Sequence, residues 1–301
     1  MKDLDLTSLR YFVAACEWGN IARAAEHEHI VPSAISKRLA QLEADLGVAL
    51  LQRQRRGVAP TPAGELLLEQ GRALLMDASR VAQDVSSLGT GVRGQVRLLA
   101  TVSAIAEALP DDVAAFLQRP EHQHISVDIE ECLSSTIVRR LKEGSATLGV
   151  LWNASAGEGL PQVPYRRDHL AVVVHAEHPL AGSKRCWFAD TLAYEHVGLQ
   201  SSTAVNSMLL RAAAMAGRPL HYRTQVSNFE ATLRVVRARL GISIIPVEIA
   251  SAYAGVFGLK VIPLRDDWAS RRFAICLRDR GSLPKAAAML VDFLAAAARG
   301  E

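Results

Sequence analysis

The sequence lacks the features that mark several large classes of protein. Its 301 residues contain no run of about 18 consecutive apolar residues, so we expect no membrane-spanning helix and no membrane partner. The segment Met1–Asp5 carries acids where a secretory signal would carry cations followed by an apolar stretch, so we expect a cytoplasmic protein. The four cysteines are widely separated and form no Cys-x-x-Cys pair, which excludes a disulfide-stapled scaffold.

Motifs of the common enzyme chemistries are also missing. We find no Gly-x-Ser-x-Gly nucleophile elbow, no phosphate-binding P-loop, no His-Glu-x-x-His zinc motif and no paired acids at strand ends. The pairs His27/His29 and His122/His124 are two residues apart, and such residues face different directions on a helix. We therefore expect no catalytic residue, no metal site and no cofactor. An α/β enzyme of less common chemistry remains an alternative.

The composition is that of an ordinary folded chain, long enough for about two or three domains. Half of the residues are hydrophobic and 22% are charged. The net charge of +3 is concentrated in residues 33–62, where Glu43 and Asp45 oppose five basic side chains. These are Lys37, Arg38, Arg53, Arg55 and Arg56. A local basic patch of this kind indicates a polyanionic partner.

The first part of the chain has helical periodicity in three short pieces, over 9–16, over 21–28 and from Pro32 onward. The apolar face of the third helix is formed by Ile35, Leu39, Leu42 and Leu46. Its opposite face carries short or cationic side chains, which are Ser33, Ser36, Lys37 and Ala40. This arrangement predicts a helix-turn-helix whose second helix enters the DNA major groove. A three-helix bundle with a solvated charged face is the alternative.

Residues 52–60 form a short, turn-forming segment crowded with arginine. Arg53, Arg55 and Arg56 directly follow the helical region. Guanidinium groups pair with phosphate oxygens two at a time, so a small β-wing here would hold the DNA backbone beside the groove. Exposed arginines can also serve solubility alone, and it is their place next to the helices that favours DNA.

A long helix is predicted from Thr61-Pro62 onward, with the threonine as its cap. Its apolar residues follow a heptad-like seam, which requires a partner helix. They are Leu67, Leu74, Ala78, Val81, Val85 and Leu88. The alternative is that this helix packs on its own chain. The glycine-rich segment 89–94 then indicates a hinge.

Beyond residue 94, predicted strands and helices alternate. Strands are expected over 95–101, 125–131 and 147–152, with helices over 105–118 and 136–142 between them. A second set follows over 169–246, and two strands and a helix close the chain. This order predicts a parallel sheet with helices on both faces, built as two small α/β subdomains with a cleft between them.

Several segments resemble the LysR-type transcriptional regulators. Gly19–Glu26 is similar to the helix-turn-helix core of that family, Ser33–Gly47 to its recognition helix and Thr61–Gly64 to the start of its linker helix. His178-Pro179-Leu180 and the run Leu240–Pro246 fit its second effector subdomain. The resemblance implies an α/β protein with an N-terminal all-α winged helix-turn-helix. It also implies an effector domain of two α/β subdomains like a type II periplasmic binding protein.

The resemblance further implies domain boundaries, an assembly and a function. The DNA-binding domain would span 1–61, the linker helix and hinge 62–91, and the effector domain 92–301, with subdomain I at about 92–165 and 269–301 and subdomain II at about 166–268. The protein would be a sequence-specific transcriptional regulator whose oligomeric conformation is switched by a small co-inducer. It would dimerise through the linker helix and form a tetramer of paired dimers. Its partners would be double-stranded promoter DNA and, at the promoter, RNA polymerase.

The chain departs from the family pattern where the recognition helix begins. Val31, Pro32 and Ser33 stand where the family usually has Ser-Gln-Pro, so neither a side-chain cap nor readout by glutamine is available. Lys37 stands where arginine is common, which replaces a planar fork by a point charge. Base readout is therefore expected from Ser33, Ser36 and Lys37.

Hydroxyl-bearing residues stand where predicted strands end and helices begin in the effector domain. Such helix starts suit a carboxylate or another small anion, although any one of these hydroxyls can instead be a helix cap. Together with family similarity, this predicts effector binding by Thr101, Ser103, Ser134, Ser202, Thr203 and Phe229. Cys132 lies beside the same cleft, so a thiol-based redox-sensing regulator is a second alternative.

Overall fold

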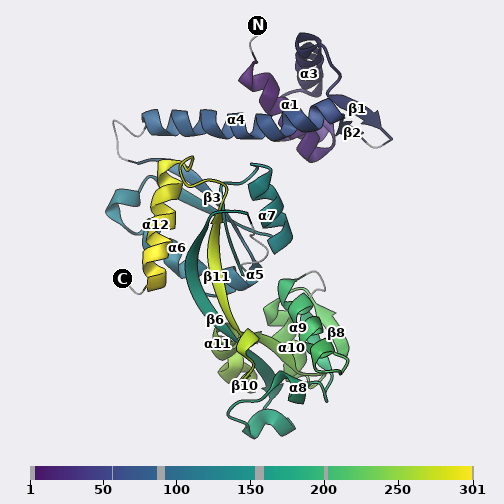
Figure 1. Cartoon of the computed structure of the whole chain (residues 1–301), viewed down its shortest axis with the longest axis vertical. Helices are drawn as coiled ribbons and strands as arrows, with labels where there is room; N and C mark the ends of the chain where they lie inside the picture. The colour runs from purple at the N-terminus through teal and green to yellow at the C-terminus, as the bar shows by residue number, and fades with distance from the viewer. Residues whose placement is uncertain (1–3, 56, 87–91, 153–158, 200–202, 300–301) are drawn as a thin grey trace. The chain divides into compact units, whose positions relative to one another are not determined.

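The computed structural model describes residues 4–55, 57–86, 92–152, 159–199 and 203–299. They fall into two compact units, the first formed mainly by residues up to 91 and the second mainly by those from 92 onward (Figure 1). Within these described ranges, no helix is both long enough and apolar enough to cross a bilayer.

The first unit is built on three short helices: α1 (Leu6–Trp18), α2 (Ile21–His27) and α3 (Pro32–Leu46). Asp5 and Asn20 cap α1 and α2 by accepting backbone N–H groups of their first turns, whereas Val31 gives α3 no side-chain cap. The apolar faces of the three helices share one buried cluster. Leu46, which was predicted to join it, is the last residue of α3 and is 46% exposed.

The wing predicted for residues 52–60 is an antiparallel hairpin of β1 (Leu51–Gln54) and β2 (Gly57–Pro60). Gly57 has a φ of 125°, and a Cβ at this position would lie 2.0 Å from the carbonyl oxygen of Gly19. The N–H of Val58 donates to that same oxygen at 2.9 Å. The hairpin is therefore fixed against the turn between α1 and α2.

α4 (Pro62–Ser86) carries the predicted seam, of which Leu88 lies outside the described residues. Leu67 packs against the core of the first unit, so this part of the helix has its partner within the chain. Three further seam residues are 42%, 54% and 64% exposed, namely Leu74, Val81 and Val85. The outer part of the seam is thus the part available to a second helix.

The second unit is built on a mixed sheet with the strand order β10-β6-β11-β5-β3-β4, with β9 paired to β6. Its strands are β3 (Gly94–Ala100), β4 (Ile125–Glu131), β5 (Leu148–Trp152), β6 (Gln162–His175), β9 (Ser243–Pro246), β10 (Leu259–Pro263) and β11 (Ser270–Leu277). β3 pairs in parallel with β4 and β5, as predicted. The prediction is wrong for β6 and β11, which run antiparallel to their neighbours. These two long strands extend side by side (Figure 1), and their antiparallel direction is set by pairing between segments that are far apart in the sequence.

Helices surround the sheet: α5 (Val102–Ala106), α6 (Leu109–Leu117), α7 (Ser134–Lys142), α8 (Phe188–Thr191), α9 (Ala204–Met215), α10 (Phe229–Arg237), α11 (Val247–Phe257) and α12 (Lys285–Arg299). A separate parallel pair is formed by β7 (His196–Leu199) and β8 (Tyr222–Val226). The single helix predicted over 105–118 is two helices, α5 and α6. Pro110 lies in the first turn of α6, where its missing N–H is tolerated, whereas inside a continuous helix it would remove a hydrogen bond.

β6 forms the centre of the second subdomain and is covered on both faces. Leu170, Val172 and Val174 pack in a cluster with residues of α9, whereas Val173 packs in a cluster with residues of α10 and α11. Alternate residues of a strand point to opposite faces, so this near-continuous apolar run is what a strand buried on both sides requires.

Candidate functional site

α3 presents a polar and cationic surface away from the core of the first unit. Ser33, Ser36 and Lys37 are exposed, whereas Ile35 and Leu39 are 0% and 4% exposed. Helical spacing separates the two sets onto opposite faces. Short side chains and one ammonium group allow this face to approach a polyanion closely, as the major-groove helix of a helix-turn-helix must.

Arg38, also predicted to contact DNA, makes contacts within the chain. Its Nη1 lies 3.0 Å from Oδ2 of Asp5, and its guanidinium lies 6.0 Å from the ring centroid of Tyr11. Hydrogen bonds from the side chain and backbone of Ser8 lower the pKa of the Asp5 carboxyl, so this partner is ionised. Arg38 therefore joins α3 to the start of α1, and 49% of its side chain remains exposed to a phosphate outside.

The wing presents arginines beside that surface. Arg53 on β1 and Arg55 in the turn are exposed, and their side chains make no hydrogen bond or ion pair within the described part of the chain. Arg56, the third predicted arginine, lies outside that part. Oε1 of Glu43 on α3 accepts the N–H groups of residues 50 and 51 at 2.7 Å and 3.0 Å. One carboxylate thus connects the recognition helix to the first strand of the wing.

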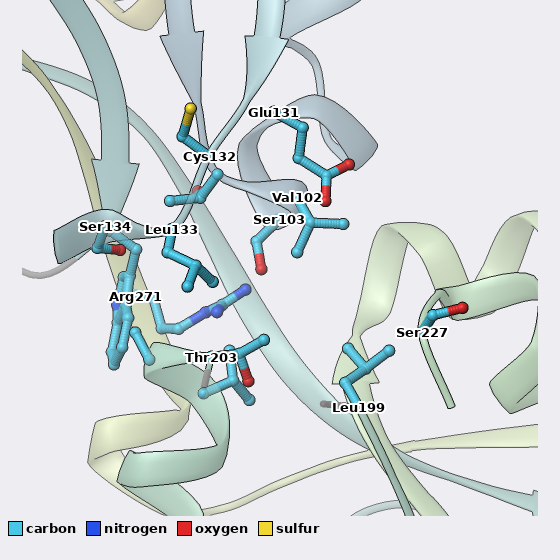
Figure 2. Close-up of a pocket in the computed structure, with 14 residues that line it drawn as sticks. Val102, Ser103, Glu131, Cys132, Leu133, Ser134, Leu199, Thr203, Ser227 and Arg271 are labelled. Carbon is cyan, nitrogen blue, oxygen red and sulfur yellow. The ribbon is translucent and has the colours of Figure 1, made fainter. Parts of the chain in front are cut away.

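A cavity of about 230 Å³ opens in the second unit, at the carboxyl ends of β3, β4 and β5 (Figure 2). Parallel strands end at the same edge of a sheet, so residues far apart in the sequence meet there. The wall includes four of the six residues predicted to bind an effector, which are Thr101, Ser103, Ser134 and Thr203. The cavity therefore contains most of the hydroxyl groups that the sequence singles out.

The other two predicted residues are not found in this wall. Phe229 is 7% exposed and packs in the core cluster with Val173 and Leu233. It shares the buried face of α10 with Leu233 and Val236, in a cluster that lies behind Val102 and Leu199 of the cavity wall. Ser202 lies outside the described residues.

The hydroxyl groups in the wall have different partners. Thr203 serves as the cap of α9, because its Oγ1 accepts the N–H of Asn206 at 3.2 Å, so the helix-cap alternative holds for this residue. Thr101 stands at the corresponding position before α5 but makes no cap bond. Its Oγ1 is buried without a hydrogen-bond partner in the described structure. Thr101 is thus a polar group that the fold itself does not satisfy.

Arg271, a buried cation in the same wall, was not among the residues predicted from the sequence. Residues 271, 273, 275 and 277 of β11 are all buried, so Arg271 occupies a position on the inward-facing side of the strand. This alternation along the strand was the sequence feature from which the inward position of Arg271 could have been predicted. The carboxylate that neutralises Arg271 belongs to Asp168, which lies 103 residues earlier and directly opposite on β6.

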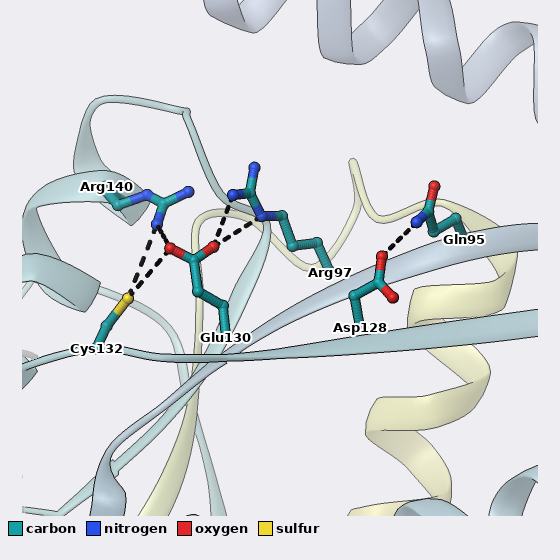
Figure 3. Close-up of polar contacts among 6 residues, drawn as sticks. All are labelled: Gln95, Arg97, Asp128, Glu130, Cys132 and Arg140. Carbon is teal, nitrogen blue, oxygen red and sulfur yellow. Dashed lines mark hydrogen bonds and ion pairs between the residues drawn. The ribbon is translucent and has the colours of Figure 1, made fainter. Parts of the chain in front are cut away.

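Cys132 also lines the cavity, but its surroundings oppose a redox role. Its Sγ lies 3.6 Å from Oε1 of Glu130 and 3.8 Å from Nη1 of Arg140, and Arg97 pairs with the other Glu130 oxygen at 2.6 Å (Figure 3). Burial, together with the negative charge of Glu130, raises the pKa of the Cys132 thiol. A raised pKa keeps the thiol protonated and less nucleophilic. Across the described ranges, no group of three or more His, Cys, Asp or Glu side chains is placed to hold a metal ion.

Comparison with known proteins gives the same order of domains. Residues 6–65 match the bacterial regulatory helix-turn-helix protein model of the lysR family, and residues 89–299 match the LysR substrate binding domain. The RuBisCO operon transcriptional regulator of Allochromatium vinosum is 25% identical over 301 residues, covering 98% of this chain and 97% of the relative.

Solved structures share the fold. A variant of full-length OxyR from Pseudomonas aeruginosa has a TM-score of 0.76 at 21% identity, covering 98% of this chain and 95% of OxyR. Full-length CbnR complexed with its target DNA has a TM-score of 0.66 at 24% identity, covering 97% and 99% of the two chains. Both domain models match, in the order that the structure shows. The chain therefore belongs to the LysR family, as a DNA-binding transcriptional regulator with an effector-binding domain.

Proposed function

We propose that this regulator contacts promoter DNA with the outer face of α3 and with the wing. The helix supplies Ser33, Ser36 and Lys37 to base edges and Arg38 to a phosphate. The wing supplies Arg53, Arg55 and Arg56 to the sugar–phosphate backbone. The observation that carries this proposal is that Arg53 and Arg55 are exposed and without an ion pair in the described structure, on a hairpin tied to α3 through Glu43.

In this proposal, residues 1–61 bind DNA, 62–91 link and dimerise, and 92–301 bind the effector. Two copies pair along the exposed part of the seam on α4, and two such dimers form a tetramer. CbnR, whose structure is solved with its target DNA, supports duplex DNA as the partner of the first unit.

The effector of this proposal is a small anion in the cavity of the second unit. Its hydroxyl donors are Thr101, Ser103, Ser134 and Thr203 of the cavity wall, together with Ser202, which precedes Thr203 in the sequence. β6 and β11 run through both subdomains, so a ligand bound beside them can change how the subdomains meet. That change would alter the spacing of the DNA-binding heads in the oligomer.

DNA binding at several salt concentrations tests the first part of the proposal. The operator is selected from a pool of random duplexes with the full-length protein, and its affinity is then measured by fluorescence anisotropy. We expect Arg53→Gln or Arg55→Gln to weaken binding to all sequences and to reduce the slope of log affinity against log salt by about one. Lys37→Ala should instead change which bases are preferred.

Arg10→Gln is the matched control, because Arg10 is a 56% exposed arginine on α1 that pairs with Glu28. It should leave both the affinity and the salt slope unchanged. Binding that does not depend on salt, or an equal loss in all three arginine variants, would remove the basis of the assignment.

A further inference from the structure

Arg271 is held rigidly in the wall of the effector cavity. It lies on β11 directly opposite Asp168 on β6, and neither side chain is exposed. Its Nε donates to Oδ1 of Asp168 at 2.7 Å, and its Nη2 donates to Oδ2. The ring centroids of Trp152 and Phe273 lie 5.3 Å and 5.6 Å from the guanidinium carbon. These contacts fix the group before any ligand binds.

The third guanidinium nitrogen, Nη1, is buried and has no hydrogen-bond partner in the part of the chain that the structure describes. The same is true of Oγ1 of Thr101, which belongs to the same cavity wall. Figure 2 shows the guanidinium between Leu133 and Thr203. Buried polar groups without a partner destabilise a fold unless something completes them. Two donors left open in one wall indicate a ligand that brings acceptors.

The charges in the wall leave room for one anionic group. Among the described residues of the wall, Arg271 is the only cation and Glu131 is a carboxylate. Asp168 occupies Nε and Nη2 of Arg271, so in the described structure Nη1 is the nitrogen that remains for an anion. A second carboxylate on the ligand would therefore find no cation and would meet the charge of Glu131. The other large side chains in the wall are apolar: Val102, Leu133, Trp152, Leu199 and Val205.

We infer that the effector is a compact, apolar monocarboxylate, bound by Nη1 of Arg271 and the hydroxyl of Thr101. One carboxylate oxygen accepts from each donor, which satisfies both buried groups with a charge-assisted bond at Arg271. The apolar body lies against Trp152 and Leu133. The cavity volume of about 230 Å³ suits a small ring or a short chain. This inference rests on the proposed function, because it specifies the ligand of the same cavity.

The test uses the full-length protein and three probe acids: cyclohexanecarboxylate, benzoate and phenylacetate. Each is compared with its own amide and with a dicarboxylate of the same carbon skeleton. Affinity is measured by titration calorimetry, and Trp152 in the wall provides a second signal through its fluorescence. We expect at least one monocarboxylate to bind about tenfold or more tightly than both of its analogues.

Variants of Arg271 identify the group responsible. Arg271→Gln should reduce the affinity for the carboxylate to that for the amide, and Arg271→Lys should restore part of it. Arg271→Gln leaves Asp168 buried without its partner, so the double variant Arg271→Gln/Asp168→Asn, which removes both charges, provides a folded comparison. Arg272→Gln is the control, since Arg272 is the next residue of β11 and is exposed.

The inference is overturned if no monocarboxylate binds, if amides or dicarboxylates bind equally well, or if the variants of Arg271 keep the preference. The proposed function fails separately. The proposed function stands if the protein binds DNA in a salt-dependent way and responds to another kind of small anion in the cavity. It fails if the salt-dependent DNA binding is absent.

Discussion

Glu107 follows α5 and carries a carboxyl group that burial favours in its neutral form. Its Oε1 is buried without a hydrogen-bond partner among the residues that the structure describes. Burial and the negative charges of Asp168 and Glu248 raise the pKa of Glu107 from 4.5 to about 7, against the opposing effect of Arg271. In the unfolded chain the group ionises near its ordinary pKa, so the folded state holds a proton that the unfolded state releases.

We predict that Glu107→Gln stabilises the protein more at pH 8 than at pH 5. At low pH both states hold the proton, so the group does not disfavour folding. As the pH rises from 4.5 to about 7, only the unfolded state loses the proton, and the stability of the wild type falls. One pKa unit corresponds to about 1.4 kcal/mol, so the gain at pH 8 is at most about 3 kcal/mol and is reduced by partial exposure.

Urea unfolding at the two pH values measures this difference. Glu121→Gln is the control, because the Glu121 side chain is 57% exposed and should leave the difference between the two pH values unchanged. If Glu107→Gln changes the free energy of unfolding equally at both pH values, the raised pKa is refuted.

The wing depends on one glycine for its position. A Cβ at Gly57 would lie 2.0 Å from the carbonyl oxygen of Gly19, and its φ of 125° is one that other residues rarely adopt. We predict that Gly57→Ala moves the wing away from the turn between α1 and α2. Arg53 and Arg55 then lose their phosphate partners, and the affinity for DNA falls about tenfold or more. Fluorescence anisotropy with the selected operator measures the loss.

Gly47→Ala is the control that separates the loss of the contact with Gly19 from the effect of backbone strain. Gly47 ends α3 with a φ of 71°, but nothing lies within 4 Å of a Cβ placed there. It should therefore cost only about 1 kcal/mol of stability, seen in a thermal melt, with little change in affinity for DNA. Equal losses of affinity in the two alanine variants would show that the contact with Gly19 does not matter.

Local patterns predicted the elements of the first unit well, because short helices and a hairpin are specified by residues close in sequence. Periodicity alone indicated the buried face of α3 at Ile35 and Leu39, and arginine with glycine indicated the wing. The sequence analysis did not predict α11, although its Ile249, Ala250, Ala254 and Phe257 pack in one cluster at helical spacing. The directions of strands β6 and β11 depend on pairing between segments that are distant in the sequence, and the hydrophobic periodicity of a segment carries no information about such pairing.

The same limit applies to the effector cavity. Thr101, Ser103 and Ser134 were predictable because strand ends of an α/β sheet meet at one edge. Arg271 was not, because its role depends on a carboxylate 103 residues away and on which of its nitrogens that carboxylate leaves open. Such a site is defined by tertiary contacts, and the sequence shows only an arginine at an inward position of a strand.

At the scale of the whole molecule, α4 has an apolar surface without a partner in the described chain. Leu74, Val81 and Val85 recur at the seven- and four-residue spacing of a helical seam and are 42% or more exposed. A contiguous apolar stripe on a long helix indicates a partner helix. A second copy fits this surface, since two DNA-binding heads joined through α4 can read two half-sites on one face of the duplex.

We predict that Leu74→Glu or Val81→Glu converts the oligomer to a smaller species. A carboxylate in the seam of both copies meets its own equivalent, so burial and like-charge repulsion both oppose pairing. Ser79→Glu is the matched control, because it adds the same charge at an exposed polar position of α4. Sedimentation velocity measures the oligomeric state. DNA binding is compared between duplexes that carry one half-site and duplexes that carry two. The seam variants should bind a single half-site as the wild type does, but should lose the increase in affinity that a second half-site gives. If both seam variants sediment like the control, the exposed stripe on α4 does not join the copies, and another surface must.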